Sequence, residues 1–427
     1  MKNRAGAWLG AALAFVLAAC GGGGGDSGST DRAPSAPPAA PATTTLADYL
    51  KSRADRVTVM GYPEPSAEER AWLFDDSRER AVAQVARSLV SWPNAVALPP
   101  LQASFVQTVG AAARGDTLAE LRQAHPGVAP GFYASMRRTA GVHRELSALT
   151  GTRLLPEFLA ATDSFGPLPP LAHWSAEEVA DPRGLSSHGS DVRLVVSDRI
   201  NVDLALPRGE AYEGLVVGAD GSRSSLAVLE LTDGVVQHRA ADYAAQALRV
   251  GQHLLVKIEP AVVPLRTFAE SRLSAALSEV VHTVGSPTLV ALPPGKMLLP
   301  RQGMSVDGRE ASSNGLASAF DELRADLRGL DGGGTYLKAD NGPSGLWMEA
   351  GALSMYGSHT TTFIHSIRNP HAPDTSSGGS VLVNPVTCPE RVVALRPFFI
   401  VVLDADRRVV ALAAMGAIAS TACWSMG

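Results

Sequence analysis

Apolar positions follow a helical period early in the chain and a strand period later. Residues 78–89 carry an apolar face at helical spacing, and residues 101–113 are typical of a buried helix. Thr117, with Glu120 three residues on, predicts the start of another helix by a capping box. Strand patterns follow at residues 192–197, 211–217, 225–231, 253–258, 288–292, 296–299, 398–403 and 408–413, with one more helix at 272–283. Helices early and strands late predict an α+β fold.

The N-terminus has the pattern of a secretion signal. Lys2 and Arg4 precede an uncharged apolar stretch at 5–19, which is too short to span a bilayer comfortably. The stretch ends in Leu-Ala-Ala-Cys, which resembles the lipobox of bacterial lipoproteins, so we expect a signal peptide at 1–20 and a lipid on Cys20. A plain signal with a coincidental cysteine is the alternative. Gly21 in place of aspartate favours the outer membrane, by a rule taken from enteric bacteria.

Residues 21–45 are rich in glycine, proline, alanine, serine and threonine, a composition that cannot bury enough apolar surface to order itself. We therefore expect a tether at 21–45 and one globular domain at 46–427. The expected location is the bacterial cell envelope, with the domain lipid-anchored on its periplasmic or surface side.

Composition narrows the function classes. The chain has 427 residues, 45% of them hydrophobic and 19% charged, which excludes a wholly disordered protein. A net charge of −5 gives no basic field for nucleic acid. Three cysteines exclude a disulfide-dense scaffold and a four-cysteine zinc site.

Catalytic motifs are missing from the sequence. It has no Gly-x-Ser-x-Gly, Ser-x-x-Lys or His-Glu-x-x-His motif and no phosphate-binding glycine loop. His359, His365 and His371 are six residues apart, so an extended chain would place them on one side. A metal site is one interpretation of that spacing, and polar loop residues are the favoured one. We predict no metal, no cofactor and no catalytic residue.

Several segments resemble the serpin family in order and spacing. Each motif alone matches a family pattern only modestly, but their order and spacing extend over nearly all of residues 78–418, which makes the match fairly specific. They are Asn94 with Leu98-Pro99-Pro100-Leu101, the segment 110–121, residues 296–301, the segments 315–320 and 325–330, Tyr336-Leu337, and 396–403 with 414–418. The resemblance implies helices packed around three β-sheets, with an exposed reactive-centre loop.

The same resemblance implies a suicide inhibitor rather than an enzyme. A target protease, most often of the serine class, attacks the loop and forms an acyl-enzyme. The cut loop then enters the main sheet as a new strand and distorts the oxyanion hole of the protease, so the acyl bond persists. Such a protein needs no catalytic residue of its own.

The hinge of this loop is predicted at Gly357, Ser358, Thr360, Thr361 and Thr362, against a family pattern Glu-x-Gly-Thr-x-Ala. Counting alternate residues from Ser358 predicts that Ser358, Thr360, Thr362, Ile364 and Ser366 face the core after insertion, and Arg368 would share that face. Met355 replaces the usual acidic residue, and segment 98–102 lacks the family's two serines. The loop is also roughly fifteen residues longer than is usual, which adds little closure entropy.

The scissile bond stays open between several candidates. Counting from Gly357 leads to His371, and counting back from Pro397 leads to Val386 and Thr387. A trypsin-like protease would choose the bond between Arg368 and Asn369, unless Arg368 is simply a solvated loop residue.

Cys388 and Cys423 remain once Cys20 carries lipid, and both lie beside the terminal strands. In an oxidising envelope we expect them to form a disulfide, with two buried free thiols as the alternative.

Three functions follow from these observations. The first is an envelope-anchored serpin-like inhibitor of serine or cysteine proteases. The second is a non-inhibitory serpin-like protein, acting as a binding module or protease substrate, which the long loop and the missing serines favour. The third, a lipoprotein hydrolase, is opposed by the absent nucleophile motif.

Overall fold

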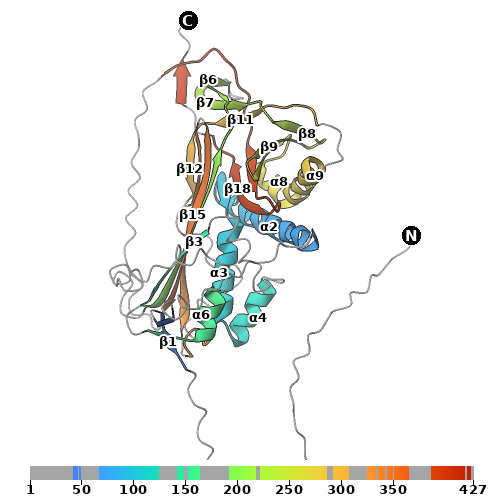
Figure 1. The fold of residues 1–427 in the computed structure, drawn as a ribbon. Coiled ribbons are helices and arrows are strands. Elements are labelled where there is room, and N and C mark those ends of the chain that lie inside the picture. The colour runs from blue at the N-terminus through green and yellow to red at the C-terminus, as the bar shows by residue number, and fades with distance from the viewer. Residues whose placement is uncertain are drawn as a thin grey trace, which may run out of the picture. The chain divides into compact units, whose positions relative to one another are not determined.

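The computed structural model describes residues 42–46, 48–49, 67–124, 142–148, 152–163, 192–217, 222–285, 292–306, 325–332, 335–341, 344–349, 351–364, 386–418 and 421–424. The chain separates into the units Met1–Ala40 and Pro41–Gly427, and every described residue belongs to the second (Figure 1). The expected signal peptide and Cys20 lie outside the described residues. Thr44–Thr45 (β1), at the end of the expected tether, pairs antiparallel with Arg153–Leu154 (β4).

The predicted helices are confirmed, with longer bounds. Their bounds, with those of two further helices, α6 and α8, are α2 Ala67–Ser88, α3 Pro99–Ala112, α4 Gly115–Ala124, α6 Pro156–Asp163, α8 Leu265–Ser271 and α9 Leu273–Gly285. Two prolines begin α3, where their missing N–H groups have no helical partner to lose. No described helix is long and apolar enough to span a membrane.

The prediction that Thr117 caps α4 is wrong. The helix begins two residues earlier, at Gly115, which has a positive φ of 47°. The Thr117 hydroxyl oxygen instead accepts the backbone N–H of Asp326, 3.0 Å away. Thr117 therefore ties α4 to a distant segment rather than capping its own helix.

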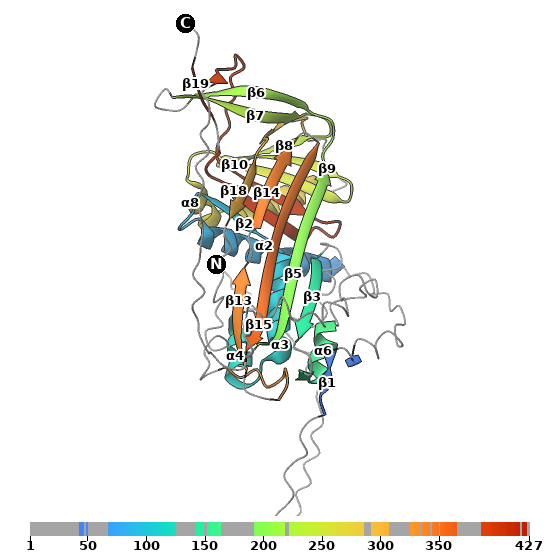
Figure 2. The same ribbon diagram turned by 90° about the vertical axis from the view of Figure 1, so that its left-hand side faces the viewer.

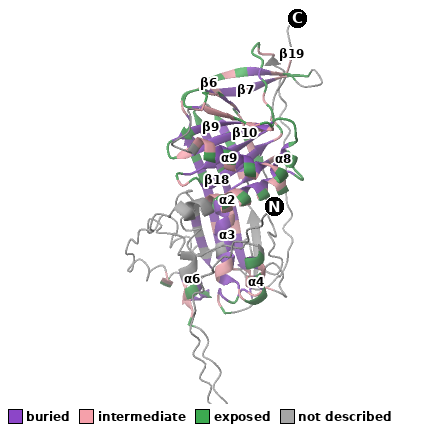
Figure 3. Cartoon of the chain, turned by 90° about the vertical axis from the view of Figure 1, so that its right-hand side faces the viewer, coloured by how far each residue is buried: buried purple, intermediate pink, exposed green. Residues whose placement is uncertain are grey.

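The most buried layer is an antiparallel sheet, here called the core sheet. Its order is β2 (Asn94–Ala97), β18 (Val409–Met415), β17 (Phe398–Leu403), β10 (His253–Pro260), β9 (Tyr243–Val250) and β8 (Val236–Arg239). Both β17 and β18 are buried along their whole length, which explains their continuous apolar runs (Figure 3). Helices α2, α8 and α9 pack on one face through side chains such as Val85, Phe268 and Leu277.

A smaller sheet, here called the small sheet, lies at the C-terminal cysteines. Cys423 is part of one of its strands, and Cys388 directly follows another. It consists of β6 (Glu210–Val217), β7 (Arg223–Leu231), β11 (Met297–Pro300), β19 (Thr421–Trp424) and β16 (Val386–Thr387). Strand β7 is central to this sheet. It forms a hairpin with β6 on one edge and pairs with β11 and β19 on the other edge. The predicted strands 211–217, 225–231 and 296–299 are thereby confirmed.

The third sheet, here called the long sheet, has the order β12 (Gly303–Val306), β14 (Ser344–Glu349), β15 (Ala352–Ile364), β5 (Val192–Ala205) and β3 (Val142–Ala148). Strand β13 (Tyr336–Asn341) pairs with the second half of β15. Its inner face packs on α3 and α6 through Phe105, Val109 and Phe158. Three larger sheets and several helices confirm the α+β class for the described residues.

Candidate functional site

The predicted hinge residues lie in β15, the central strand of the long sheet. β15 pairs antiparallel with β5 over its whole length of 13 residues. On its other side it pairs antiparallel with β14 at 352–356 and with β13 at 359–364 (Figure 2). Because both flanking sides run opposite to β15, they run parallel to each other. β15 therefore fills the gap between two parallel elements and completes a continuous sheet.

The prediction of which β15 residues face the core is wrong by one position. The inward residues are Leu353, Met355, Gly357, His359, Thr361 and Phe363, all buried. Ser358 and Thr360, expected in the core, are partly exposed on the outer face, as is Ile364, and Ser366 and Arg368 lie outside the described residues. Thr362 is buried as well, although its neighbours Thr361 and Phe363 point to the opposite face.

Packing explains the phase of the strand. A Cβ on Gly357 would lie 2.3 Å from Cδ1 of Leu98, so any side chain at this inward position would require Leu98 to move. Phe363 meets Phe158 of α6 edge to face, with ring centroids 5.9 Å apart. Small serines and threonines fit either face of a sheet, so their alternation alone left the phase undetermined.

The strand starts earlier than the predicted hinge. Gly357, Ser358 and the three threonines at 360–362 occupy the middle and second half of β15. A tight turn precedes it, between Glu349 of β14 and Ala352 of β15, which are register partners. Gly351 has a φ of 93° there, a conformation that glycine adopts without strain. This turn carries the Glu-x-Gly pattern that Met355–Gly357 lacks.

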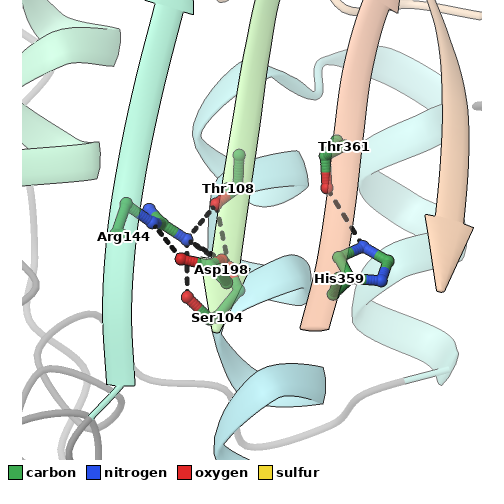
Figure 4. Close-up of polar contacts among 6 residues, drawn as sticks. All are labelled: Ser104, Thr108, Arg144, Asp198, His359 and Thr361. Atoms are coloured by element: carbon green, nitrogen blue, oxygen red, sulfur yellow. Dashed lines mark hydrogen bonds and ion pairs between the residues drawn. The ribbon is translucent and has the colours of Figure 1, made fainter. Parts of the chain in front are cut away.

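A buried charged pair lies beneath the long sheet (Figure 4). Arg144 of β3 contacts both carboxylate oxygens of Asp198 of β5, with two N–O distances of 2.7 Å. The same guanidinium donates to the hydroxyl oxygens of Ser104 and Thr108 on α3, at 2.5 and 2.8 Å. All four side chains are buried. The sequence patterns gave no signal for this pair, because its two members are 54 residues apart.

His359 of β15 lies next to this pair, in line with it across neighbouring strands. It is the register partner of Asp198, which in turn pairs with Arg144. Its Nε2 lies 3.1 Å from the Thr361 hydroxyl, and its ring packs edge to face on Phe105, with centroids 4.7 Å apart (Figure 4). The described residues contain no group of three side chains suited to a metal, while His365 and His371 lie outside them. His359 is therefore a core residue in this structure.

The segment after the loop, residues 386–393, is fixed to the small sheet; we call it the anchor segment. Val386 and Thr387, predicted as scissile candidates, form β16 and pair parallel with Cys423 and Trp424. The predicted disulfide Cys388–Cys423 is present, with Cα atoms 4.9 Å apart. The other scissile candidates, Arg368, Asn369 and His371, lie outside the described residues.

Arg391 adds a second attachment for the anchor segment. Its guanidinium pairs with Glu210 at 2.6 Å and with Glu230 at 2.8 Å, and it lies 3.5 Å from the ring centroid of Tyr212. Burial and the hydrogen bond to Glu230 raise the pKa of Tyr212. The backbone of Leu215 donates to the Arg391 carbonyl at 2.7 Å and accepts from Val393 at 2.8 Å. The anchor segment is thus held by covalent, ionic and backbone contacts.

Asn94 links two segments that each resemble the serpin family. The Asn94 side-chain oxygen accepts the backbone N–H groups of Gly416 and Ala417, both at 3.0 Å. The bonds join the start of β2 to the residues that follow β18. The segments 94–101 and 414–418, which we matched separately, therefore meet in space.

Comparisons with known proteins give a structural likeness only. No protein-family model matches the sequence, and no curated protein matches it. A cleaved Serpin 42Da is similar with a TM-score of 0.59 and 12% identity, over 83% of this chain and 100% of that chain. A loop-inserted, cleaved ovalbumin mutant is similar with a TM-score of 0.59 and 12% identity, over 81% of this chain and 100% of its own.

A third solved structure, the thermophilic serpin tengpin in its latent state, is similar with a TM-score of 0.56 and 10% identity, over 86% of this chain and 100% of its own. All three likenesses span the whole of the solved chain. The chain has the serpin fold.

Proposed function

We propose that the protein is a serpin-type inhibitor of serine or cysteine proteases, attached to the bacterial envelope through a lipid on Cys20. One observation carries this proposal: residues 352–364 form a central strand with partners on both sides. A loop-insertion trap requires a sheet that accepts such a strand. β15 meets that requirement over its whole length.

The inward side chains of β15 supply a driving force for insertion. Leu353 and Met355 join the core cluster shared with the core sheet, and Phe363 joins the cluster around α3 and α6. Each is fully buried. Burying one large apolar side chain stabilises a fold by about 1.5–3 kcal/mol, so these three residues favour the inserted strand over an exposed loop.

The bait bond follows from the start of the strand. If the hinge is the Glu349–Gly351 turn, the count that leads from Gly357 to His371 leads instead from Gly351 to His365. That residue comes directly after the last residue of β15. The bond after Arg368 remains the choice of a trypsin-like protease. Val386 and Thr387 are less suitable, because they belong to the anchor segment.

A second candidate is a non-inhibitory protein whose β15 is permanently in the sheet. It is favoured because β15 and the anchor segment occupy their sites together in one uncut chain. Twenty-two residue steps join Ile364 to Val386, and at most 3.3–3.6 Å per step they span up to about 75 Å. A strand of 13 residues is only about 43 Å long. The long loop thus lets insertion occur without cleavage.

A denaturing gel and a thermal melt separate these candidates. The purified protein would be mixed with trypsin-, chymotrypsin-, elastase- and subtilisin-like proteases, and the products sized and sequenced. An inhibitor yields a boiling-resistant band at the summed mass, with the released peptide starting near residue 366, and its melting temperature rises on cleavage. Cleavage without such a band by all four proteases, with an unchanged melting temperature, contradicts inhibition and supports permanent insertion.

A further inference from the structure

Two exposed aromatic side chains lie against the outer face of the long sheet. Trp347 of β14 is 51% exposed and Tyr356 of β15 is 37% exposed. A Cβ on Gly303 of β12 would fall 2.0 Å from Cε3 of Trp347, and one on Gly345 would fall 2.4 Å from Cζ of Tyr356. Each ring therefore occupies the space above a glycine of the neighbouring strand. The glycines let both rings rest on the backbone while part of each stays open to solvent.

Hydrogen-bonding groups adjoin these rings on the same face. Ser354 is the register partner of Trp347, and Asn201 is the register partner of Tyr356. The Asp203 carboxylate accepts from the Ser354 hydroxyl at 2.5 Å and from the Asn201 amide at 2.5 Å. These bonds hold the carboxylate in place, and each of its oxygens keeps a lone pair for a further donor.

We propose that this surface, the aromatic platform of Trp347, Tyr356, Asn201, Asp203 and Ser354, binds a neutral glycan. A sugar ring has an apolar face of C–H groups and a rim of hydroxyls. The negative face of an aromatic ring attracts the polarised C–H groups. The carboxylate, amide and hydroxyl beside the rings are suited to the sugar hydroxyls.

The positions of the two aromatic residues on the sheet fit a chain of linked sugars. Trp347 and Tyr356 are diagonal neighbours on adjacent strands, since Trp347 pairs with Ser354 and Tyr356 with Gly345. Diagonal neighbours lie about 7–8 Å apart. That separation is within reach of two linked sugar rings, so one ligand can contact both aromatic residues.

Other ligands fit this geometry less well. Quaternary ammonium groups are bound in aromatic cages, whereas these two rings lie along one flat sheet. Proline-rich peptides dock in grooves between aromatic side chains, which a flat face does not offer. The arrangement therefore favours a flat ligand with a hydroxyl rim.

The aromatic platform draws on three strands and exists only while β15 lies between β14 and β5. Tyr356 and Ser354 belong to β15, Trp347 belongs to β14, and Asn201 and Asp203 belong to β5. A glycan that binds here stabilises the inserted strand by mass action. This coupling to insertion rests on the proposed function, whereas glycan binding to the structure described here does not.

The test is a calorimetric binding titration of the full-length protein with cellohexaose, chitohexaose and maltohexaose. We expect saturable binding of at least one of these glycans. Trp347→Ala and Tyr356→Ala each weaken it by about tenfold or more. Trp92→Ala is the matched control, since Trp92 is also 51% exposed but lies outside the platform. It leaves the affinity unchanged, and circular dichroism checks that every variant folds.

Three results would overturn the proposal: no binding of any of the three glycans, equal weakening by Trp92→Ala, or Trp347-dependent binding of decaproline or choline without glycan binding. The protease gel is a separate readout. A protein that forms no covalent complex yet binds glycan through Trp347 refutes the proposed inhibition alone. A protein that traps protease but binds no glycan refutes this inference alone.

Discussion

At the scale of single residues, the Arg144–Asp198 pair makes the sharpest stability prediction. Removing one member of a buried pair leaves an uncompensated charge, which costs about 3–5 kcal/mol. Asp198→Ala should therefore lower the free energy of unfolding by that amount, measured by urea denaturation. The double variant Arg144→Met with Asp198→Leu removes both charges and should recover most of the loss. Equal losses in the two variants would contradict a charge-based explanation.

Lys257 predicts a specific dependence of stability on pH. Its side chain is 1% exposed, and its ammonium donates to the Leu298 carbonyl at 2.8 Å and to Glu259. Burial lowers the pKa of Lys257, although Glu259 opposes the shift. In the unfolded chain this lysine keeps its proton up to about pH 10.4. Between the two pKa values the unfolded state binds more protons, so the free energy of unfolding rises with pH.

The comparison variant is Lys257→Met, which cannot titrate. We expect the free energy of unfolding of the wild type to increase relative to that of this variant as the pH rises from neutral toward 10. Urea denaturation at each pH measures the difference. A difference between the two proteins that stays constant over this range would show that Lys257 keeps its ordinary pKa in the fold.

At the scale of secondary-structure elements, the phase of β15 can be tested directly. Gly357→Val places a side chain where Leu98 already lies and should lower the free energy of unfolding by about 1–3 kcal/mol. Ser358→Val, one residue on and facing outward, should change it by less than about 0.5 kcal/mol. In the protease gel, Gly357→Val should also shift products from complex to cleaved chain. If Ser358→Val destabilised the protein more than Gly357→Val, the sequence-based prediction that Ser358 faces the core would be right after all.

The elements predicted correctly are those whose burial leaves a strong pattern. β17 and β18 are buried on both faces, so their apolar runs identified them without context. β13 and β14 were missed, because Asn341-Gly342-Pro343 is typical of a turn and the flanking residues alternate weakly. The inward face of β15 was misassigned for a related reason. A period of two gives the alternation, but the packing of Gly357 against Leu98 and of Phe363 against Phe158 sets its phase.

At the scale of the whole molecule, contacts between distant segments were the least predictable from sequence. The disulfide was predicted because only two cysteines remained after Cys20, and the family segments gave the general fold. The contacts of Arg391 join the anchor segment to the distant hairpin β6–β7, and the aromatic platform joins the hairpin β14–β15 to the distant strand β5, so no local sequence pattern predicts either. The lipid on Cys20 and the scissile bond stay predictions.

The anchor segment makes the last prediction, since it connects the loop to the C-terminal tail. The disulfide closes a sequence separation of 35 residues, which stabilises the fold by up to about 4 kcal/mol through chain entropy. Cys388→Ser with Cys423→Ser should lower the free energy of unfolding by up to that amount. A reductant should bring the wild type to the same level and leave the variant unchanged.

Arg391→Ala provides the control, because the Arg391 side chain is partly exposed and solvent weakens its ion pairs, so their loss should lower the free energy of unfolding much less than loss of the disulfide. Its effect should be the same with and without reductant. The Leu215 N–H donates to the Arg391 carbonyl and the Val393 N–H donates to the Leu215 carbonyl. Exchange of both amides should quicken in the cysteine variant if the disulfide holds the anchor segment on β6. Unchanged exchange there, together with a full loss of stability, would show that the disulfide acts through the unfolded chain alone. The backbone pairing and Arg391 would then suffice to keep the end of the loop in place.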